Sequence, residues 1–142
     1  MLVDANILLY AIDEASPQHE RCRAWLEEHL NGPRRVGLAW QSLVGFVRIA
    51  THPRALEHPL TADEAMTDVE AWLAAPAAWT PLPTAAHAAV LGDLVRRHRV
   101  TGDLVPDARL AALALEHGLT VCSADTDFAR FTEIEWLNPL VR

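Results

Sequence analysis

The sequence predicts an α/β domain built on a parallel sheet, and two observations support this. Short apolar runs alternate along the chain with longer segments in which apolar residues recur at helical spacing, the pattern of strands connected by helices. Two of these runs, Met1–Val3 and Leu119–Cys122, are followed within three residues by aspartates, Asp4 and Asp125. In an open parallel sheet, ligands bind in the crevice beyond the carboxyl ends of the strands, so both acids are expected to face it.

The first half of the chain is expected to contain two strands. Met1–Val3 is too short to identify a strand by itself, but Asp4 follows directly and an apolar stretch continues behind it. Ser16 and Pro17 form a helix start, because an N-cap candidate precedes a proline at the first helical position. The other expected elements here are a helix over 17–30, a strand over 36–38, a helix over 41–51 and a loop over 54–59.

The second half is expected to contain three further strands. A capping box at Thr61–Glu64 begins a helix. Thr84 is expected to cap another, while Pro106 and Gly118 suit the first turn and the C-terminal end of a third. The expected elements are helices over 61–75, 84–98 and 106–117, and strands over 78–82, 119–122 and 133–137. The first and last of these strands are expected at the edges of the sheet, the first because it contains a proline.

Length and composition indicate one domain over residues 1–142 with a real core. No apolar run approaches 18 residues and the N-terminus lacks a signal-peptide pattern, so we expect a cytoplasmic protein without membrane association. Cys22 and Cys122 lack metal-type spacing and are expected to be reduced thiols. Lysine is absent, which excludes lysine-dependent phosphate loops and Schiff-base chemistry, and motifs of serine hydrolases, zinc proteases and dinucleotide-binding proteins are absent too.

Four aspartates are the candidate site: Asp4, Asp107, Asp125 and Asp127. Taken singly, an aspartate at a helix start or a turn is most often a cap. Taken together, carboxylates without histidine or cysteine partners suit a hard cation, Mg²⁺ or Mn²⁺. Acids held close to one another repel, and a bound metal relieves this repulsion and supplies the chemistry of a metal-dependent nuclease.

The stretches MLVDAN, VPDARLAALALEHG and VCSADTDFARF, in this order, resemble the PIN domain, and more closely the VapC toxins of bacterial toxin–antitoxin pairs. The resemblance runs over nearly the whole chain. It implies a three-layer α/β/α sandwich with a mainly parallel five-stranded sheet in the order 3-2-1-4-5. It also implies an endoribonuclease toxin that cleaves RNA phosphodiester bonds, forms a homodimer and is blocked by a cognate antitoxin.

The resemblance also assigns residue roles. Asp4, Asp107 and Asp125 fall on metal-binding positions of the family, and Asp127 follows as an auxiliary catalytic acid. Asn6 is expected to orient the scissile phosphate or a ligand carboxylate; a helix-start role is the alternative.

One position departs from the family. VapC-like sequences commonly carry a glutamate in the helix over 41–51, where this chain has Gly45. Glycine within a helix is unfavourable, so either close packing requires it or another acid has replaced the lost one. Asp127 is the favoured replacement, whereas Asp103 is expected to cap its helix.

A second interpretation is a PIN-fold module that binds RNA or protein with weak or no nuclease activity. Gly45 and the net charge of −7 motivate it. Any RNA contact must come from local arginines; the densest cluster, 96–99, is equally explained as a solvated helix end. Arg48 is expected either to pair with a site carboxylate or to extend its head group into solvent.

The remaining expectations concern packing. His87 is expected to be a packed core histidine, and the tryptophans are expected in the core or in a dimer interface. The apolar content predicts a dimer interface at the helix over 41–51 or its neighbours, and an antitoxin groove between the helices over 17–30 and 61–75.

Overall fold

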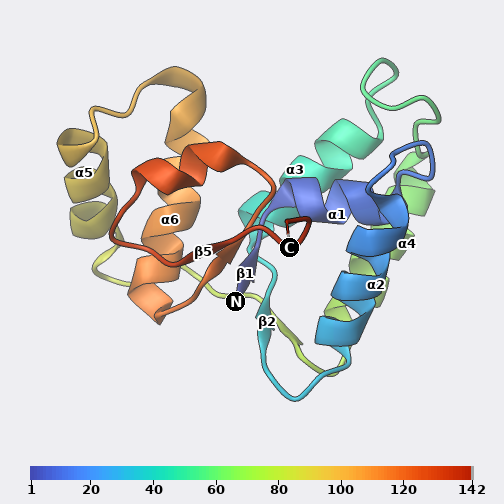
Figure 1. Ribbon diagram of the computed structural model, residues 1–142, viewed down its shortest axis with the longest axis horizontal. Coiled ribbons are helices and arrows are strands. Elements are labelled where there is room, and N and C mark those ends of the chain that lie inside the picture. The colour runs from blue at the N-terminus through green and yellow to red at the C-terminus, as the bar shows by residue number, and fades with distance from the viewer. Residues whose placement is uncertain (142) are drawn as a thin grey trace.

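A parallel sheet of five very short strands lies between two groups of helices in the computed structural model, which describes residues 1–141 (Figure 1). The strands are β1 Leu2–Val3, β2 Val36–Gly37, β3 Ala78–Trp79, β4 Val121–Cys122 and β5 Trp136–Leu137. The α-helices are α1 Ala5–Ile12, α2 His19–Leu30, α3 Trp40–Ala50, α4 Ala62–Leu73, α5 His87–Arg97 and α6 Val105–His117. Two 3₁₀ turns, η1 Gly102–Leu104 and η2 Thr126–Arg130, complete the elements.

The strand order is β3-β2-β1-β4-β5 and all pairs are parallel. This confirms the predicted order and places the third and fifth strands at the edges. In β1, Leu2 lies opposite both Gly37 and Val121, so β1 is the central strand. The connections leave β1 toward β2 and return to β4 on its other side, and a crevice opens where the strand order reverses.

Each face of the sheet has its own apolar core. One core packs α1, α2, α3 and α4 together and includes the fully buried Leu8, Leu26 and Phe46. The other packs α5 and α6 and includes Leu110 and Phe128. Each of these side chains contributes roughly 1.5–3 kcal/mol by leaving water, so the helices, rather than two-residue strands, hold the sheet together.

The helix ends agree with the sequence signals in three places and differ in two; one agreement is Pro106, which lies in the first turn of α6. The capping box of Thr61 and Glu64 is present, and Gly118 ends α6 in the left-handed conformation with φ 64°. However, α2 begins at His19 and α5 at His87. Ser16 and Thr84 each form a local turn in which their hydroxyl accepts from the backbone N–H two residues on, so neither caps a helix.

His87 is partly buried, and its Nδ1 lies 2.6 Å from Glu116 Oε2, so the prediction of an ordinary core histidine is wrong. Glu116 Oε1 also accepts from the Thr84 hydroxyl at 2.7 Å, which fastens the start of α5 to the end of α6. The same contacts explain why Thr84 is not a cap: its hydroxyl is held by a carboxylate.

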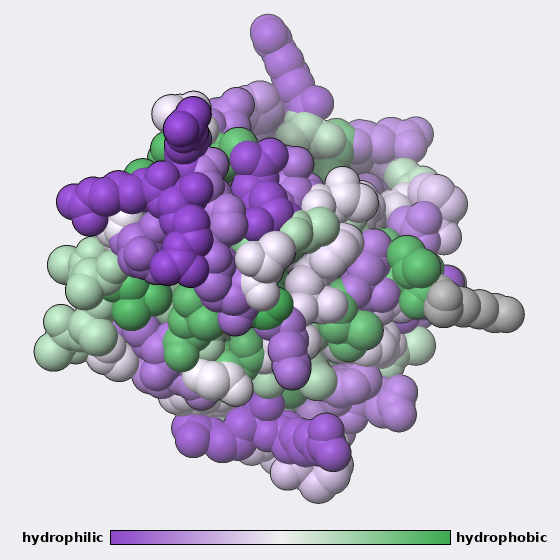
Figure 2. Space-filling model, turned by 60° about the vertical axis from the view of Figure 1, so that its left-hand side comes forward, coloured by the Kyte–Doolittle hydropathy of each residue, from purple (hydrophilic) through white to green (hydrophobic). Residues whose placement is uncertain are grey.

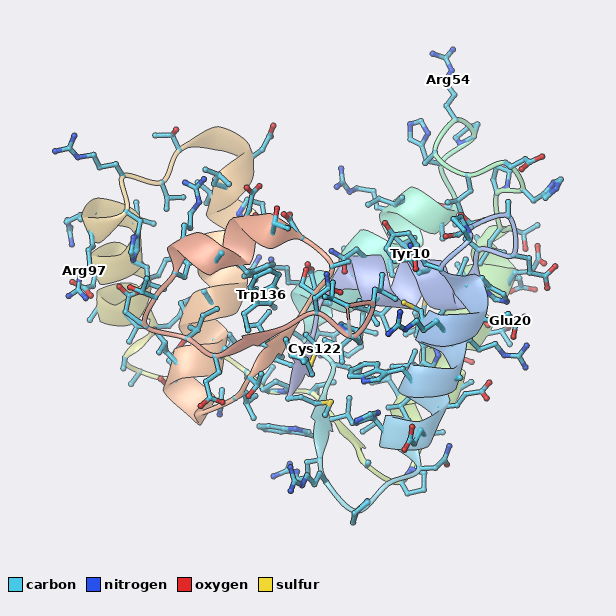
Figure 3. The ribbon with its side chains drawn as sticks, viewed as in Figure 1. Tyr10, Glu20, Arg54, Arg97, Cys122 and Trp136 are labelled. Carbon is cyan, nitrogen blue, oxygen red and sulfur yellow. The ribbon has the colours of Figure 1, made fainter. Side chains whose placement is uncertain are left out.

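Four of the five tryptophans are partly buried, as expected, whereas Trp40 is 48% exposed at the start of α3. Cys22 and Cys122 are free and buried, and burial raises the pKa of their thiols to about 11 and about 12. In Figure 3, Cys122 and Trp136 lie at the centre of the molecule, whereas Arg54 extends outward from the loop between α3 and α4.

Figure 2, in which the side bearing α5 comes forward, shows mostly hydrophilic residues interrupted by smaller hydrophobic patches. Within residues 1–141, none of the helices combines the length and the apolar character that crossing a membrane requires.

Candidate functional site

The four predicted acids come from three places in the fold. Asp4 follows β1 and is the N-cap of α1; Asp125 follows β4 and is the N-cap of η2. Asp127 lies in the first turn of η2, and Asp107 lies in the first turn of α6. Because β1 and β4 are parallel neighbours, their carboxyl ends bring these segments to one edge of the sheet at the point where the strand order reverses.

Asp4 is held by three donors. Its Oδ1 accepts from the backbone N–H of Ala5 at 2.8 Å, and its Oδ2 accepts from the Ser123 hydroxyl at 2.7 Å and from the Asn6 amide at 3.2 Å. Its own backbone N–H donates to the carbonyl of Cys122 at 2.9 Å. The carboxylate is therefore fixed in direction by α1 and by the segment after β4 together.

Asn6 uses both ends of its side-chain amide within the protein. The NH₂ group donates to Asp4 Oδ2 and to Ser123 Oγ at 3.0 Å, and Oδ1 accepts from the backbone N–H of Ala124 at 3.2 Å. These contacts are those of a residue that orients a site carboxylate, one of the two roles expected for it. They leave its amide committed to protein groups.

Ser123 is a site residue that the sequence analysis did not identify. It is fully buried, and its hydroxyl donates to Asp4 while accepting from the Asn6 amide and from the backbone N–H of Asp125 at 3.0 Å. Its carbonyl accepts from the indole N–H of Trp136 at 3.0 Å. The sequence offered one indication of this role: Ser123 is a polar residue immediately after an apolar strand and two positions before Asp125.

The tightest acidic group consists of Asp107, Asp125 and Asp127, each of which offers one oxygen, and these oxygens lie within 4.8 Å of one another. From the sequence, Asp4 is the expected third member and Asp127 an auxiliary acid. The structure differs because Asp4 is drawn toward Ser123 and Ala5. Asp127 joins the group because η2 contacts α6, and its backbone N–H donates to Asp125 Oδ1 at 2.8 Å, which fixes the turn that carries both acids.

Mutual repulsion is visible in the pKa values. Burial is the largest cause raising the pKa of Asp107 to about 7, and the charges of Asp125, Asp4 and Asp127 add to it, whereas Arg130 lowers it. The pKa of Asp4 is also raised, first by burial and then by the charge of Asp125, against the opposing hydrogen bonds from Ser123 and Ala5. These four acids therefore share one electrostatic field.

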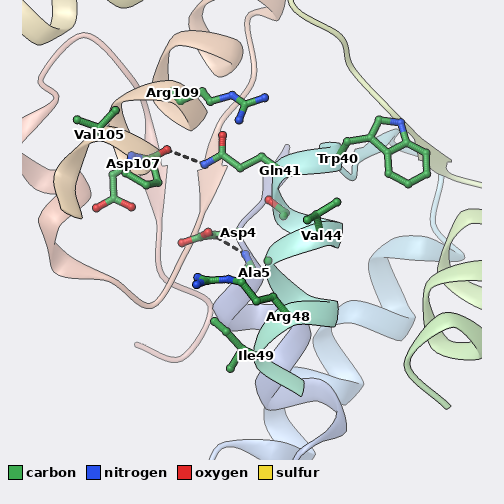
Figure 4. Close-up of a pocket in the computed structure, with 13 residues that line it drawn as sticks. Asp4, Ala5, Trp40, Gln41, Val44, Arg48, Ile49, Val105, Asp107 and Arg109 are labelled. Carbon is green, nitrogen blue, oxygen red and sulfur yellow. Dashed lines mark hydrogen bonds between the residues drawn. The ribbon is translucent and has the colours of Figure 1, made fainter. Parts of the chain in front are cut away.

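A pocket of about 560 Å³ opens beside Asp4 and Asp107, between α3 and α6 (Figure 4). Gln41 spans its top, where its Nε2 donates to the carbonyl of Pro106 at 2.7 Å. Arg48 is exposed and makes no ion pair among residues 1–141, so the expected pairing with a site carboxylate is not formed and the head group faces solvent.

Two further residues bear on the site. Gly45 lines the pocket, and a Cβ built there would meet only the Cβ of Ala5, at 3.5 Å, which is ordinary contact. Close packing is therefore not what requires this glycine. Asp103 lies in η1 and caps neither η1 nor α6, whose N-caps are Thr101 and Leu104, so the expected cap is wrong.

Comparison with known proteins gives consistent results. The family model of the PIN domain matches residues 1–134. Ribonuclease VapC37 of Mycobacterium tuberculosis is 44% identical over 138 residues, which cover 97% of this chain and 96% of the relative. Ribonuclease VapC33 of the same species is 37% identical over 140 residues, covering 99% of this chain and 98% of the relative.

Solved structures agree with the fold. The complex VapBC2 of Rickettsia felis, bound to a DNA fragment from its promoter, matches with a TM-score of 0.69 at 15% identity, over 96% of both chains. VapC20 of Mycobacterium tuberculosis, a toxin that cleaves the sarcin–ricin loop, matches with a TM-score of 0.69 at 15% identity, over 92% of this chain and 94% of that one.

The Ser123 contacts predict a measurable effect on stability. Ser123→Ala removes the hydroxyl donor to Asp4 and leaves the N–H of Asp125 without its acceptor, so the free energy of unfolding should fall by about 2–3 kcal/mol. Ser42 is the matched control, because it is 2% exposed and its hydroxyl has no partner among residues 1–141. Ser42→Ala should change the free energy of unfolding by less than about 0.5 kcal/mol in urea denaturation. Equal losses in the two variants would contradict this role for Ser123.

The raised pKa of Asp107 predicts a pH-dependent effect. Asp107 holds its proton up to about pH 7 in the folded chain but only to its ordinary value of 3.8 when unfolded, so wild-type stability falls as pH rises through this window. In metal-free protein, Asp107→Asn should therefore gain stability over wild type between pH 4 and pH 7, reaching about 1–2 kcal/mol after discounting for solvent screening. Thermal unfolding in a chelator measures this. The exposed Asp103→Asn should show no such trend, and a gain that shrinks with rising pH would refute the assignment.

Proposed function

The chain belongs to the PIN-domain family, and from this premise we propose that it is a metal-dependent endoribonuclease, the toxin of a type II, VapBC-like toxin–antitoxin pair. The observation that carries the proposal is the convergence of four aspartates from β1, β4 and α6 where the strand order reverses. The full-length similarity to ribonucleases of the VapC group supports the same activity.

The residues fit a hard divalent cation, Mg²⁺ or Mn²⁺. The donor set is made of carboxylate oxygens, and three of them lie within the separation that one ion can span. Burial and then the charges of neighbouring acids raise the pKa of Asp107 and of Asp4, and a bound cation would stabilise both groups in their charged form. Asp107 and Asp125 would hold the ion, together with Asp127 or Asp4.

The chain's own groups would then act by position. When bound, the ion supplies positive charge against the phosphodiester and lowers the pKa of a water molecule. Ser123 and Asn6 keep Asp4 in one orientation through hydrogen bonds of 2.7 and 3.2 Å, so that no reorganisation is needed when the substrate arrives. Asp127 is near enough to Asp107 and Asp125 to share charge with them and to act as an auxiliary acid.

The proposal includes two protein partners. An antitoxin is supported by the similar fold of VapBC complexes. A hollow of about 450 Å³ lies between the C-terminal ends of α2 and α4, where the antitoxin groove was expected. A homodimer is supported by an apolar groove of about 460 Å³ on α3 and α4, whose rim includes Trp40, Val44 and Met66, all more than 40% exposed.

The alternative, a PIN-fold regulatory module with weak or no nuclease activity, rests on Gly45. Without a carboxylate there, the α3 side of the pocket carries no acid, so a second cation would have one ligand fewer. The cleavage experiment separates the two functions.

Cleavage should depend on the acids and on a divalent ion. Asp4→Asn and Asp107→Asn should each lower the rate of RNA cleavage by at least about 100-fold, since each removes charge that the ion and the reacting water need. Chelator should abolish the wild-type activity, and added Mg²⁺ or Mn²⁺ should restore it. Gel-resolved cleavage of total RNA measures both effects.

Asp103→Asn is the control for that experiment, because Asp103 is exposed and lies outside the acidic group. It should cleave RNA and bind Mn²⁺ like wild type, whereas Asp127→Asn should bind Mn²⁺ more weakly. Equal cleavage by wild type, Asp4→Asn and Asp107→Asn would rule out the proposed activity and favour the regulatory module.

The dimer should depend on the α3–α4 groove. Met66→Asp places a charge in an apolar surface and should convert the dimer to monomer at micromolar concentration, measured by light scattering. Leu82→Asp is the control, since Leu82 is 59% exposed but lies outside this groove. A wild-type chain that is monomeric under these conditions would contradict the dimer.

A further inference from the structure

We propose that Arg48 and Arg109 form a phosphate clamp that holds an unpaired stretch of RNA across the pocket between α3 and α6, contacting phosphates on either side of the bond to be cut. The inference rests on the proposed function, because it takes RNA as the ligand of this site. It adds the residues that hold the substrate and the form of RNA that fits.

The negative charge of the chain and of its acidic group opposes the binding of RNA. The chain carries a net charge of −7, and four aspartates converge where a polyanion must bind. A divalent ion can offset only part of this charge and does so at one point. Phosphates further along the strand need cations beyond the acidic group, and these cations must lie on the walls of the same pocket.

Arg48 and Arg109 are the two cationic residues that line the pocket of Asp4 and Asp107. They come from different helices, α3 and α6, and Figure 4 shows their side chains on either side of the Asp4 carboxylate. Both are exposed, and neither makes an ion pair or a hydrogen bond of its side chain among residues 1–141. Both guanidinium groups are therefore free to bind an incoming anion.

Arg130 provides the contrast. It lies close enough to lower the pKa of Asp107, and its Nη2 is 4.0 Å from Asp127 Oδ1. Its charge is already directed at the acids of the chain. Arginine's planar fork suits bidentate contact with phosphate oxygens, so the unpaired Arg48 and Arg109 are the residues to which the backbone of a nucleic acid would bind.

The fold fixes the spacing between the helices that carry Arg48 and Arg109. The hydrogen bond from Gln41 to the carbonyl of Pro106 joins the start of α3 to the start of α6. Gly45 leaves the α3 wall open one turn before Arg48, because nothing but Ala5 Cβ lies within 4 Å of its missing Cβ. The α3 wall therefore carries no acid, and the charge that it presents to the pocket is that of Arg48.

The pocket also selects the form of the RNA. Its lining includes the apolar Ala5, Ile49 and Val105, which suit base and ribose faces rather than a charged surface. Its volume of about 560 Å³ is that of a small-molecule site, too small for a duplex. Unpaired nucleotides, whose bases can leave the stack, are the RNA that enters such a site.

The test measures RNA affinity without cleavage. A short, fluorescein-labelled single-stranded RNA of mixed sequence is titrated by anisotropy in chelator, over a range of salt concentrations, against wild type, Arg48→Gln and Arg109→Gln. Each variant should lose at least about five-fold in affinity and lower the slope of log K against log salt by about 0.7, the value for one phosphate contact on a single strand. An RNA hairpin with the same nucleotides fully paired should bind more weakly to wild type.

Arg34→Gln is the matched control, because Arg34 is exposed but lies just before the amino end of β2. The acids lie beyond the carboxyl ends of the parallel strands, at the opposite end of the sheet. Arg34→Gln should leave affinity and slope unchanged. Mn²⁺ binding and the thermal unfolding temperature of all three variants should equal those of wild type. If the arginines had only a structural role, their replacement would lower the unfolding temperature.

The outcomes separate the clamp from the nuclease. Arg48→Gln and Arg109→Gln that bind RNA as wild type or Arg34→Gln does would overturn the clamp even if metal-dependent cleavage is observed. Wild type that shows no salt-dependent RNA binding would overturn it as well. Loss of affinity in these two variants, in a chain that proves unable to cleave RNA, would support the clamp and contradict the proposed nuclease.

Discussion

The junction between β1 and β4 is the constraint on which the site depends. Two strands of two residues each form too few hydrogen bonds to define a crevice. The contacts just beyond the strands also hold its two sides together. The N–H of Asp4 donates to the carbonyl of Cys122, and the Ser123 hydroxyl donates back to the Asp4 carboxylate. Because Ser123 is fully buried, water does not compete for its hydroxyl in the folded chain, and the two hydrogen bonds hold the ends of β1 and β4 in register.

The same junction explains how the chain tolerates crowded acids. Asp4 is surrounded by donors from Ala5, Asn6 and Ser123, which oppose the cost of its burial. Asp107 has no such donors, and burial together with the neighbouring acids raises its pKa to about 7. Two aspartates of one site therefore have different environments: one is satisfied by the protein, and the other is left to a proton or a cation.

Local sequence signals were sufficient to predict most of the helices and strands. The capping box at Thr61, the left-handed Gly118 and the strand–aspartate transition at Asp4 each fix one boundary by short-range chemistry. Ser16 and Thr84 were misjudged because their hydroxyls can close a turn as well as cap a helix, and the choice depends on distant partners such as Glu116. The strand order came from resemblance, since no local pattern encodes which strands become neighbours.

Which acids lie near one another could be predicted from the sequence, whereas their geometry could not. Four aspartates could be named because they follow predicted strands or lie at a predicted helix start, but the exchange of Asp4 for Asp127 in the tightest group depends on Ser123, which lies 119 positions from Asp4. A buried serine looks in sequence like any small residue that ends a strand.

Gly45 shows the remaining limit. A glycine in this helix indicated either close packing or the replacement of a lost acid from elsewhere, and its neighbourhood has room for a Cβ. Its effect is therefore electrostatic rather than steric: with no acid on that turn, the charge facing the pocket from α3 is that of Arg48. The α3 side of the pocket therefore favours the binding of a polyanion and disfavours the binding of a second cation. The lack of an acid on this turn and the presence of an unpaired arginine one turn later thus act in the same direction, and both favour the proposed binding of RNA in a protein whose overall charge repels it.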